Sequence, residues 1–413
     1  MQTHLADFIR DTTAGREAAA ILRACVHCGF CSATCPTYQL LGDELDGPRG
    51  RIYLIRETLQ GAPVTALTQL HLDRCLSCRA CETTCPSGVH YSRLLDIGRE
   101  VVAQRVPRSL AARLARRALT WFLASPRLFA PAYRVGQSLR PLLPARLRAL
   151  LLPYRAPGAL PAGRRKRQMI LLAGCVQPAM APNINAAGAR LLAALDIELL
   201  IAPKAGCCGA IPLHLDEIER ARDAARRNID AWWPLLDAGA EAIVSSASGC
   251  GSQLRDYAHL LQEDPHYAAR AARVALLARD ISEIVVAEKA GLLALLAQAA
   301  PLAQAGAKLA FHAPCSLQHG LKIRGVVEEL LTAAGFTLAP VADSHLCCGS
   351  AGSYSLLQPE IAGALRGKKL AALAAGEPTA IASANIGCIA HLQAGTPTPV
   401  RHWVEYLDDR LRH

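Results

Sequence analysis

Sixteen of the 413 residues are cysteines, and half of them lie in two runs with identical spacing. Each run reads C-x2-C-x2-C-x3-C and is followed directly by a proline. The runs contain, in order, Cys25, Cys28, Cys31 and Cys35, and then Cys75, Cys78, Cys81 and Cys85. This is the spacing of bacterial-type [4Fe–4S] sites. Three thiolates on a tight loop can bind three irons of a cubane, so the sequence predicts two such clusters.

The fourth cysteine of each run is expected to serve the other cluster, as it does in two-cluster domains. The predicted ligand sets are Cys25, Cys28, Cys31 and Cys85 for the first cluster, and Cys75, Cys78, Cys81 and Cys35 for the second. Zinc is the alternative, but zinc sites are typically built from two C-x2-C pairs. Nothing near the runs supplies an acid, a base or an organic cofactor site, so the two clusters are expected to conduct electrons.

The other eight cysteines reveal an internal duplication. They are Cys175, Cys207, Cys208 and Cys250 in a first copy, and Cys315, Cys347, Cys348 and Cys388 in a second. The offsets between corresponding cysteines are 140, 140, 140 and 138 residues. A vicinal Cys-Cys-Gly occurs in both copies. Repetition at a constant offset indicates two copies of one structural unit.

Each copy alternates apolar runs typical of strands with helical patterns, which favours a small, largely parallel sheet with helices on its faces. The expected strands are Met169–Ala173, Ile197–Ala202 and Ala242–Ser246, then Lys308–His312, Thr337–Val341 and Thr379–Ser383. The cysteines follow the strand ends, where open α/β sheets place their sites. Two vicinal thiols cannot readily bind one tetrahedral ion together, so they would bridge irons of a cluster or act as redox thiols. The alternative is buried cysteines without metal.

Several strings extend these motifs and resemble a known family. They are residues 21–31, 40–55, 228–234 and 343–352. The duplicated unit resembles the cysteine-rich CCG domain of heterodisulfide reductase and related oxidoreductases. The whole order, two ferredoxin-type motifs and then two CCG domains, is similar to that of iron–sulfur subunits of glycolate oxidase (glycolate dehydrogenase).

This resemblance implies a multidomain fold, with an N-terminal all-α helical ferredoxin-like domain followed by two duplicated α/β CCG domains. A helical pattern from Gly47 to Leu59 agrees with the first part. The expected divisions are 1–105 for the ferredoxin domain, 106–167 for a basic, proline-rich linker or amphipathic segment, 168–300 for the first CCG domain and 306–413 for the second.

The resemblance also implies a function. Flavin-containing partner subunits would oxidise glycolate to glyoxylate, and this chain would pass the electrons towards the membrane quinone pool. A G-x-G-x-x-G motif after a strand is missing, which agrees with a flavin on another chain. Two alternatives are a catalytic CCG-type disulfide or quinone reductase and a zinc-stabilised scaffold without redox function.

The duplicated units depart from the full CCG pattern at one position. That pattern ends in C-x2-C, but Ala247 and Asn385 stand where the first cysteine of this pair belongs. Four cysteines remain in each copy. An additional iron–sulfur cluster or a zinc ion in the CCG domains is therefore expected, rather than the double cluster of heterodisulfide reductase.

Residues 101–168 hold 15 Lys and Arg and no Asp or Glu, whereas the rest of the chain has 30 basic and 34 acidic residues. Prolines would break this segment into short helices. We expect this segment to be either a solvated linker or an amphipathic element that binds an anionic membrane surface. In the second case Trp121, Phe122, Leu128, Phe129 and residues 150–152 would reach the lipid.

Nucleic acid is not an expected partner, because no recognition motif accompanies the charge. Without a signal peptide or a long apolar run, the chain is expected in the cytoplasm, at the inner (cytoplasmic) membrane periphery.

Overall fold

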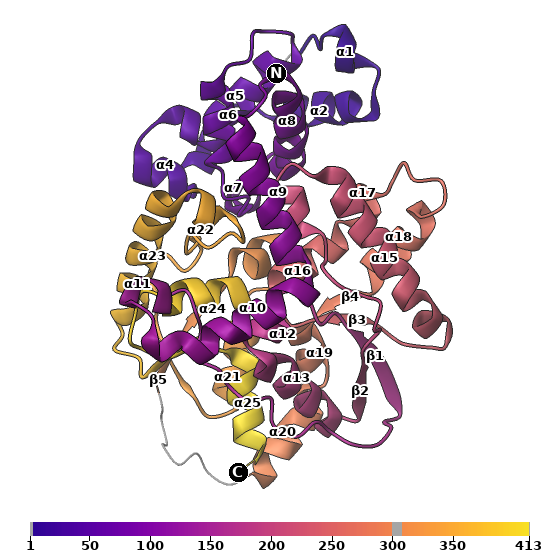
Figure 1. The fold of residues 1–413 in the computed structure, drawn as a ribbon, viewed down its shortest axis with the longest axis vertical. Helices are drawn as coiled ribbons and strands as arrows, with labels where there is room; N and C mark the ends of the chain where they lie inside the picture. Colours follow the sequence, from indigo (N-terminus) through magenta and orange to yellow (C-terminus); the bar gives the residue numbers. More distant parts are fainter. Residues whose placement is uncertain (1–2, 300–307, 413) are drawn as a thin grey trace.

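The first hundred residues form a helical unit around the two cysteine runs. The computed structural model describes residues 3–299 and 308–412 (Figure 1). The elements of this unit are α1 (Asp7–Arg10), α2 (Thr13–Ala24), α3 (Phe30–Ala33), α4 (Pro36–Leu41), η1 (Glu44–Asp46), α5 (Pro48–Leu59), α6 (Ala66–Asp73), α7 (Ala80–Thr84) and α8 (Tyr91–Arg105). Leu22, Ile55, Leu59 and Leu94 are fully buried between α2, α5 and α8. The predicted helix after Gly47 is α5, which begins with a proline at its first position, where no backbone donor is needed.

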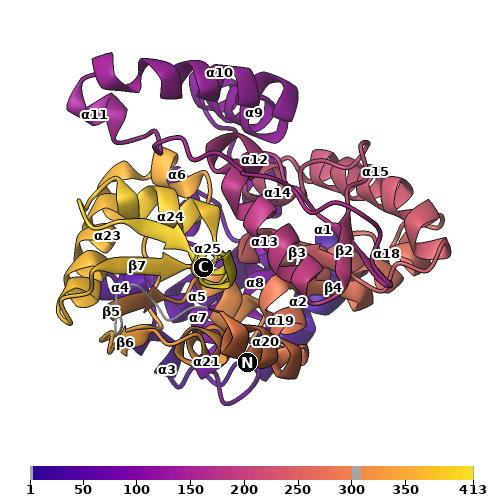
Figure 2. The ribbon, with the colours of Figure 1, turned by 90° about the horizontal axis from the view of Figure 1, so that it is seen from below.

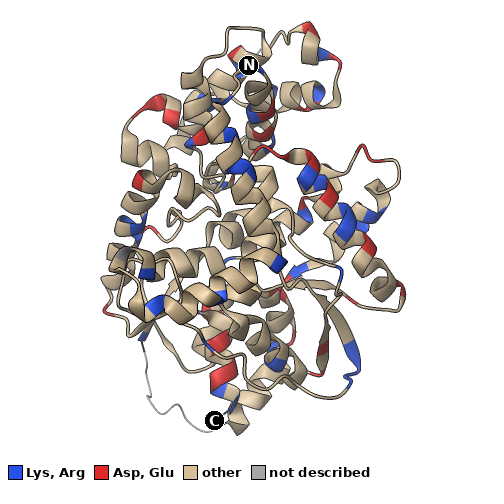
Figure 3. Ribbon diagram, in the orientation of Figure 1, with Lys and Arg blue, Asp and Glu red and all other residues tan. Residues whose placement is uncertain are grey.

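The basic segment folds as short helices, as its prolines predict. It contains α9 (Leu110–Ala124), α10 (Pro126–Leu139), the short helix η2 (Arg140–Leu142) and α11 (Ala145–Arg148). These helices form a layer on the outside of the molecule that carries basic but no acidic residues (Figures 2 and 3). Within the described residues, no helix is both long and apolar enough to cross a bilayer.

The expected lipid contacts of this segment are wrong in part. Phe129 and Leu152 are buried, and Phe129 stacks on Tyr133 with ring centroids 5.2 Å apart. Phe122 packs edge-on against Phe129 at 5.4 Å. These rings cover α12 (Gln177–Met180) and so belong to a small core of the protein. Trp121 remains 59% exposed, so the outward apolar surface is real but smaller than expected.

A cluster of ion pairs fastens the start of the basic segment to both neighbouring units. Arg108 binds Asp73 of α6 at 2.5 Å and Asp216 of the first duplicated unit at 2.9 Å. Arg116 of α9 reaches the same two carboxylates at 3.3 and 3.2 Å. All four side chains are largely buried. The segment is therefore not a freely solvated linker at this end.

Two four-stranded sheets carry the duplicated units, and every strand pairing in them is parallel. Their orders are β2-β1-β3-β4 and β6-β5-β7-β8. The strands are β1 (Arg167–Leu171), β2 (Ile197–Leu200), β3 (Ile243–Ser245), β4 (Ala278–Asp280), β5 (Lys308–His312), β6 (Thr337–Ala339), β7 (Ala380–Ser383) and β8 (Val400–His402). Six of these were predicted with small shifts at their ends. β4 and β8 were not predicted.

Helices cover both sheets and complete the α/β architecture that the sequence predicts (Figure 2). In the first unit they are α13 (Pro182–Ala194), α14 (Ala210–His214), α15 (Ile218–Asp237), α16 (Ser248–Arg255), α17 (Tyr257–Leu260), α18 (Ala268–Leu277), α19 (Ile281–Ala287) and α20 (Lys289–Gln298). In the second they are η3 (Ser316–Gly320), α21 (Val326–Ala333), α22 (Tyr354–Leu357), α23 (Pro359–Ala374), α24 (Ile386–Gln393) and α25 (Trp403–Arg412).

The two units share one interface and part of one hydrophobic core. α13 packs on α25, where Arg190 forms a bidentate ion pair with Asp408. His402 Nε2 lies 2.8 Å from the Ser246 carbonyl, and the Ser248 amide donates to the Ala384 carbonyl at 3.1 Å. The loops after β3 and β7 therefore face each other.

We predict that Asp216→Ala loosens the attachment of the basic segment. The change leaves Arg108 and Arg116 sharing one carboxylate, and an unsatisfied, largely buried charge costs about 1–3 kcal/mol. Limited proteolysis near Arg105–Ser109 should become faster, and the melting temperature should fall. Glu219→Ala is the matched control, because it removes a mostly exposed partner of Arg222 in the same unit, and such pairs contribute little. Equal proteolysis of the two variants would contradict the fastening role.

Candidate metal centres and the cysteine-lined cavity

The structure brings the N-terminal cysteines together in two adjacent groups. One cavity is lined by Cys25, Cys28, Cys31 and Cys85, together with Cys81. A second is lined by Cys75, Cys78, Cys81 and Cys35. Each predicted ligand set thus surrounds one cavity, and α7 with Cys81 stands between the two. All sixteen cysteines are described, and none of them forms a disulfide.

The same backbone conformation recurs in both cysteine loops. His27 and Gly29 adopt left-handed φ values of 55° and 86°, and their counterparts Ser77 and Arg79 adopt 52° and 60°. These turns wrap the loops around the cavities. The Ser77 amide lies 3.5 Å from Cys75 Sγ and donates to it. Amide donors to sulfur stabilise the reduced, more negative state of a cluster and tune its potential.

A buried cation, Arg51, lies beside the second cavity and had no predicted role. Its guanidinium donates to the His71 carbonyl at 2.7 Å and to Thr37 Oγ1 at 3.2 Å, and it lies 3.5 Å from Asp46. The only sequence signal was a basic residue one turn before Ile55, on the face of α5 that enters the core. A fixed positive charge next to thiolates favours their ionised form.

Burial changes the acidity of the cluster cysteines. Desolvation raises the pKa of Cys31 to about 11, and it raises the pKa of Cys78 and of Cys81 well above the usual range. Neighbouring cysteines add to each effect. These thiols stay protonated until a cation replaces the protons, so loading of metal releases protons.

A central cavity of about 250 Å³ lies where the helical unit meets both sheets. Its wall contains cysteines of all three units: Cys75, Cys78, Cys175, Cys208, Cys250, Cys315, Cys347 and Cys388. Cys75 and Cys78 also line the second cluster cavity, so the two spaces share a wall. Ala247 and Asn385, which replace the missing cysteines, line this cavity too. Cys207 and Cys348 are buried and are not among the residues of its wall, although each is the sequence neighbour of a cysteine that is.

One acid in the wall of the central cavity has an unusual pKa. Burial raises the pKa of Asp96 to about 6, against the opposing effect of Arg99 and two other arginines. A carboxyl with this pKa gains and loses protons close to neutral pH. Asp96 is thus a titratable carboxyl in the wall of the central cavity.

Glycine is required after each vicinal cysteine pair. Gly209 and Gly349 have φ values of 93° and 91°, which side chains disfavour. A Cβ on Gly349 would lie 2.6 Å from the Ala362 carbonyl oxygen. The Gly349 amide donates to Cys347 Sγ at 3.4 Å, and the Gly209 amide donates to Cys207 Sγ at 3.5 Å. The tight turn thus holds the first thiol of each pair in place.

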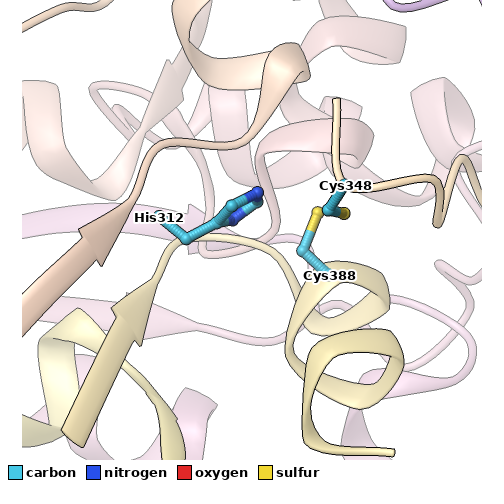
Figure 4. Close-up of side chains that lie close together, drawn as sticks. All are labelled: His312, Cys348 and Cys388. Atoms are coloured by element: carbon cyan, nitrogen blue, oxygen red, sulfur yellow. The ribbon is translucent and has the colours of Figure 1, made fainter. Parts of the chain in front are cut away.

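A histidine that sequence reasoning missed joins the second group of cysteines. His312 at the end of β5 lies with Cys348 and Cys388 so that one ligand atom of each falls within 4.8 Å of the others (Figure 4). All three are buried, and burial lowers the pKa of His312 to about 3. The 140-residue offset places Leu172 at the corresponding position of the first copy. Comparison of the two copies could have exposed this difference.

Comparison with known proteins supports the same organisation. Residues 21–89 match the family described as a 4Fe-4S dicluster domain, and residues 169–255 and 309–393 each match the family described as a cysteine-rich domain. The chain is 51% identical over 413 residues to the glycolate oxidase iron-sulfur subunit of Escherichia coli (strain K12), covering all of this chain and 99% of that protein. The chain belongs to the family of glycolate oxidase iron-sulfur subunits.

Two further relatives show how this family extends. The probable glycolate oxidase iron-sulfur subunit of Bacillus subtilis (strain 168) is 30% identical over 402 residues, which covers 90% of this chain and 88% of that protein. Lactate utilization protein A of Exiguobacterium sp. is 25% identical over 248 residues, 59% of this chain and 97% of that protein. The predicted resemblance to glycolate oxidase iron-sulfur subunits and the two predicted [4Fe–4S] clusters are confirmed. Proteins of this family are subunits of an oxidoreductase complex.

We predict that Gly349→Ala destabilises the second cysteine-rich unit. The left-handed turn and the close carbonyl oppose a methyl group, at a cost of about 1–3 kcal/mol. Gly363→Ala, in α23, is the control, because its Cβ would meet open space and alanine favours helix. Thermal unfolding of the two variants should move in opposite directions. A Gly349→Ala protein with unchanged melting temperature would show that the turn tolerates a side chain.

Proposed function

We propose that this chain is the electron-transfer subunit of a complex that oxidises a 2-hydroxy acid, glycolate, to glyoxylate. Flavin-containing partner subunits would bind the substrate, and electrons would leave through this chain towards the membrane quinone pool. The observation that carries the proposal is the shared wall of Cys75 and Cys78 between the second cluster cavity and the central cavity. Three adjacent cysteine-lined cavities support a conducting role. The names and extensive identity of the relatives support glycolate as the substrate.

The ligand assignment is part of this proposal. Cys25, Cys28, Cys31 and Cys85 would hold the first cluster, and Cys75, Cys78, Cys81 and Cys35 the second, in an α-helical ferredoxin domain. Their grouping around two cavities supports this division. The clusters supply one-electron carriers. The chain itself shields them. The Ser77 amide donates to Cys75 Sγ, and the Arg51 guanidinium, which donates to the His71 carbonyl, places a positive charge beside the second cavity.

Electrons would enter at the first cluster. Cys28 is exposed, and Val26 and Phe30 in the same loop are 68% and 61% exposed. A protein donor can approach only from such a surface. The second cluster is enclosed, and its cavity adjoins the cysteines of both CCG units, where Cys175, Cys207, Cys208 and Cys250, and Cys315, Cys347, Cys348 and Cys388 would hold additional iron–sulfur or zinc centres.

The proposed domains are 1–105, 106–167, 168–300 and 306–413. The residues that match the two families, 21–89 and then 169–255 and 309–393, follow the same order as these units. The division between the two CCG domains falls outside the described residues.

We further propose that α9 to α11 rest on the cytoplasmic face of the inner membrane. Their exposed apolar residues include Leu110, Leu114, Trp121, Val135, Leu139, Leu142, Leu147 and Leu150. They alternate with basic residues and lack acidic ones, as in interfacial helices. Arg116 of α9 lines the central cavity, so this orientation would bring the cavity close to quinone.

One observation favours a second function, a catalytic disulfide or quinone reductase. The central cavity could admit a small substrate between the CCG cysteines, with Asp96 as a proton donor. The two functions differ in what the isolated chain does. A reductase reduces a disulfide or quinone from a small reductant alone, whereas an electron-transfer subunit needs its flavin partners to oxidise glycolate.

Replacement of a cluster ligand should separate electron entry from electron exit. We expect Cys28→Ser and Cys78→Ser each to lose the iron of one cluster and to block reduction of a quinone acceptor by the complex. Reduction of the partner flavin by glycolate should continue, because that step precedes this chain. Iron analysis, EPR and stopped-flow absorbance measure these effects. Ser87→Ala, at an exposed position in the loop after Cys85, is the control. Full iron content and full quinone reduction in both cysteine variants would refute the assignment of Cys28 and Cys78 as cluster ligands.

Binding of the purified chain to liposomes tests the membrane face. Sedimentation should require anionic lipid and weaken with salt. Changing Arg113, Arg117, Arg127 and Arg134 to Glu should reduce binding strongly, since each basic residue near the surface contributes about 1 kcal/mol. A control with the same charge change elsewhere replaces Arg23, Lys204, Lys322 and Lys368, which are also exposed. Equal loss in both variants, or no binding at low salt, would assign membrane attachment to a partner.

A further inference from the structure

We propose that the second cysteine-rich unit holds a single metal ion, with zinc the best fit, bound by His312, Cys348 and Cys388. The first unit lacks this centre. The proposal deepens the proposed CCG centre of the second unit. It narrows that unit's four cysteines to Cys348 and Cys388, adds a non-cysteine ligand, and assigns this mononuclear site to one copy only.

The three side chains come from three segments that the parallel sheet brings together. His312 ends β5, Cys348 lies in the loop after β6, and Cys388 lies in the first turn of α24, which follows β7 (Figure 4). Their ligand atoms lie within 4.8 Å of one another. Tetrahedral zinc, with bonds of about 2.0–2.3 Å, holds its ligand atoms roughly 3.5–3.8 Å apart. A contraction of at most about 1.3 Å between ligand atoms would bring them to tetrahedral zinc distances.

Hydrogen bonding fixes His312 in the form that binds metal. The Ser383 hydroxyl donates to the His312 carbonyl at 3.1 Å, so its oxygen is left to accept from His312 Nδ1 at 3.0 Å. The ring proton is thereby placed on Nδ1, and Nε2 carries the lone pair. Nε2 is buried and has no hydrogen-bond partner among the described residues. A fixed tautomer with the other nitrogen free is typical of metal-binding histidines.

The ligand types favour a mononuclear ion over a cluster. Thiolate selects zinc, copper(I) or iron–sulfur centres, and imidazole suits zinc, copper, iron and nickel. A mixed set of thiolate and imidazole ligands is the usual donor set of tetrahedral zinc. Of the vicinal pair, only Cys348 belongs to the group of mutually close ligand atoms; Cys347 Sγ lies 3.8 Å from Cys315 Sγ. The Asn385 amide donates to Cys388 Sγ at 3.6 Å and supports its thiolate. Three protein ligands leave the fourth coordination position of the ion open. Because Cys388 lines the central cavity, this position is next to that cavity.

The first copy supplies an internal comparison. Cys208 and Cys250 correspond to Cys348 and Cys388, but Leu172 stands in place of His312. Leu172 is buried in the core of its unit and has no donor atom. The same fold therefore accepts leucine at this strand end, which makes His312→Leu a substitution with a precedent in the chain.

Metal analysis of the full-length chain tests the proposal. The protein is purified anaerobically, incubated with zinc, freed of unbound ion and analysed for zinc and iron. We expect about one zinc per chain in the unmodified protein. His312→Leu and Cys388→Ser should lose most of this zinc and keep the iron of both [4Fe–4S] clusters. Leu172→Val is the control at the corresponding position and should keep both metals.

Cobalt substitution gives a second readout that does not depend on activity. Cobalt bound at the tetrahedral site should give d–d and thiolate charge-transfer absorption, and His312→Leu should abolish the increment over the iron–sulfur background. Thermal unfolding and cluster absorbance verify that each variant is folded. Absence of zinc from the unmodified protein, retention of zinc by His312→Leu, or loss of iron in that variant would each overturn the proposal. Failure of electron transfer alone would instead concern the proposed function.

Discussion

Parallel strand direction is the constraint on which the rest of the structure depends. In each sheet the carboxyl ends of the strands meet at one edge, so the cysteines that follow β1, β2 and β3, or β5, β6 and β7, converge although they are far apart in sequence. The loops after β3 and β7 then face each other, and the helical unit with Cys78 closes the space between them. Three units of the chain thereby contribute to one cysteine-lined interior.

Spacing made the cysteine groups predictable, because cluster ligands on a short loop leave a fixed signature in sequence. The duplication and six strands were also readable, and β5 was predicted at its observed bounds. β4 and β8 were missed because each has three residues and a central arginine, so neither forms an apolar run. The roles of Arg51 and the burial of Phe129 could not be predicted, since each depends on neighbours supplied by distant segments. His312 could have been noticed only by comparing the two copies, and its contact with Cys348 and Cys388 again depends on distant segments.

The two CCG units show how duplicated scaffolds diverge without losing their shape. Both keep the left-handed glycine that fixes the vicinal thiols, because backbone geometry leaves no substitute there. Both replace the same further cysteine, at Ala247 and Asn385, in the wall where the two units face each other. By contrast, Leu172 and His312 differ although both are buried at a strand end. Shape is preserved at these sites while the available donor atoms change.

Unequal shielding of the two cluster sites has a consequence for oxidative damage. Cys28 reaches the surface, whereas Cys35, Cys75 and Cys81 are buried. Dissolved oxygen and peroxide meet exposed iron–sulfur centres first, so we expect inactivation by air to begin at the first site. A damaged molecule would then lose the first centre and keep the enclosed second one. The exposure of one ligand would thus set the order in which the two centres are lost.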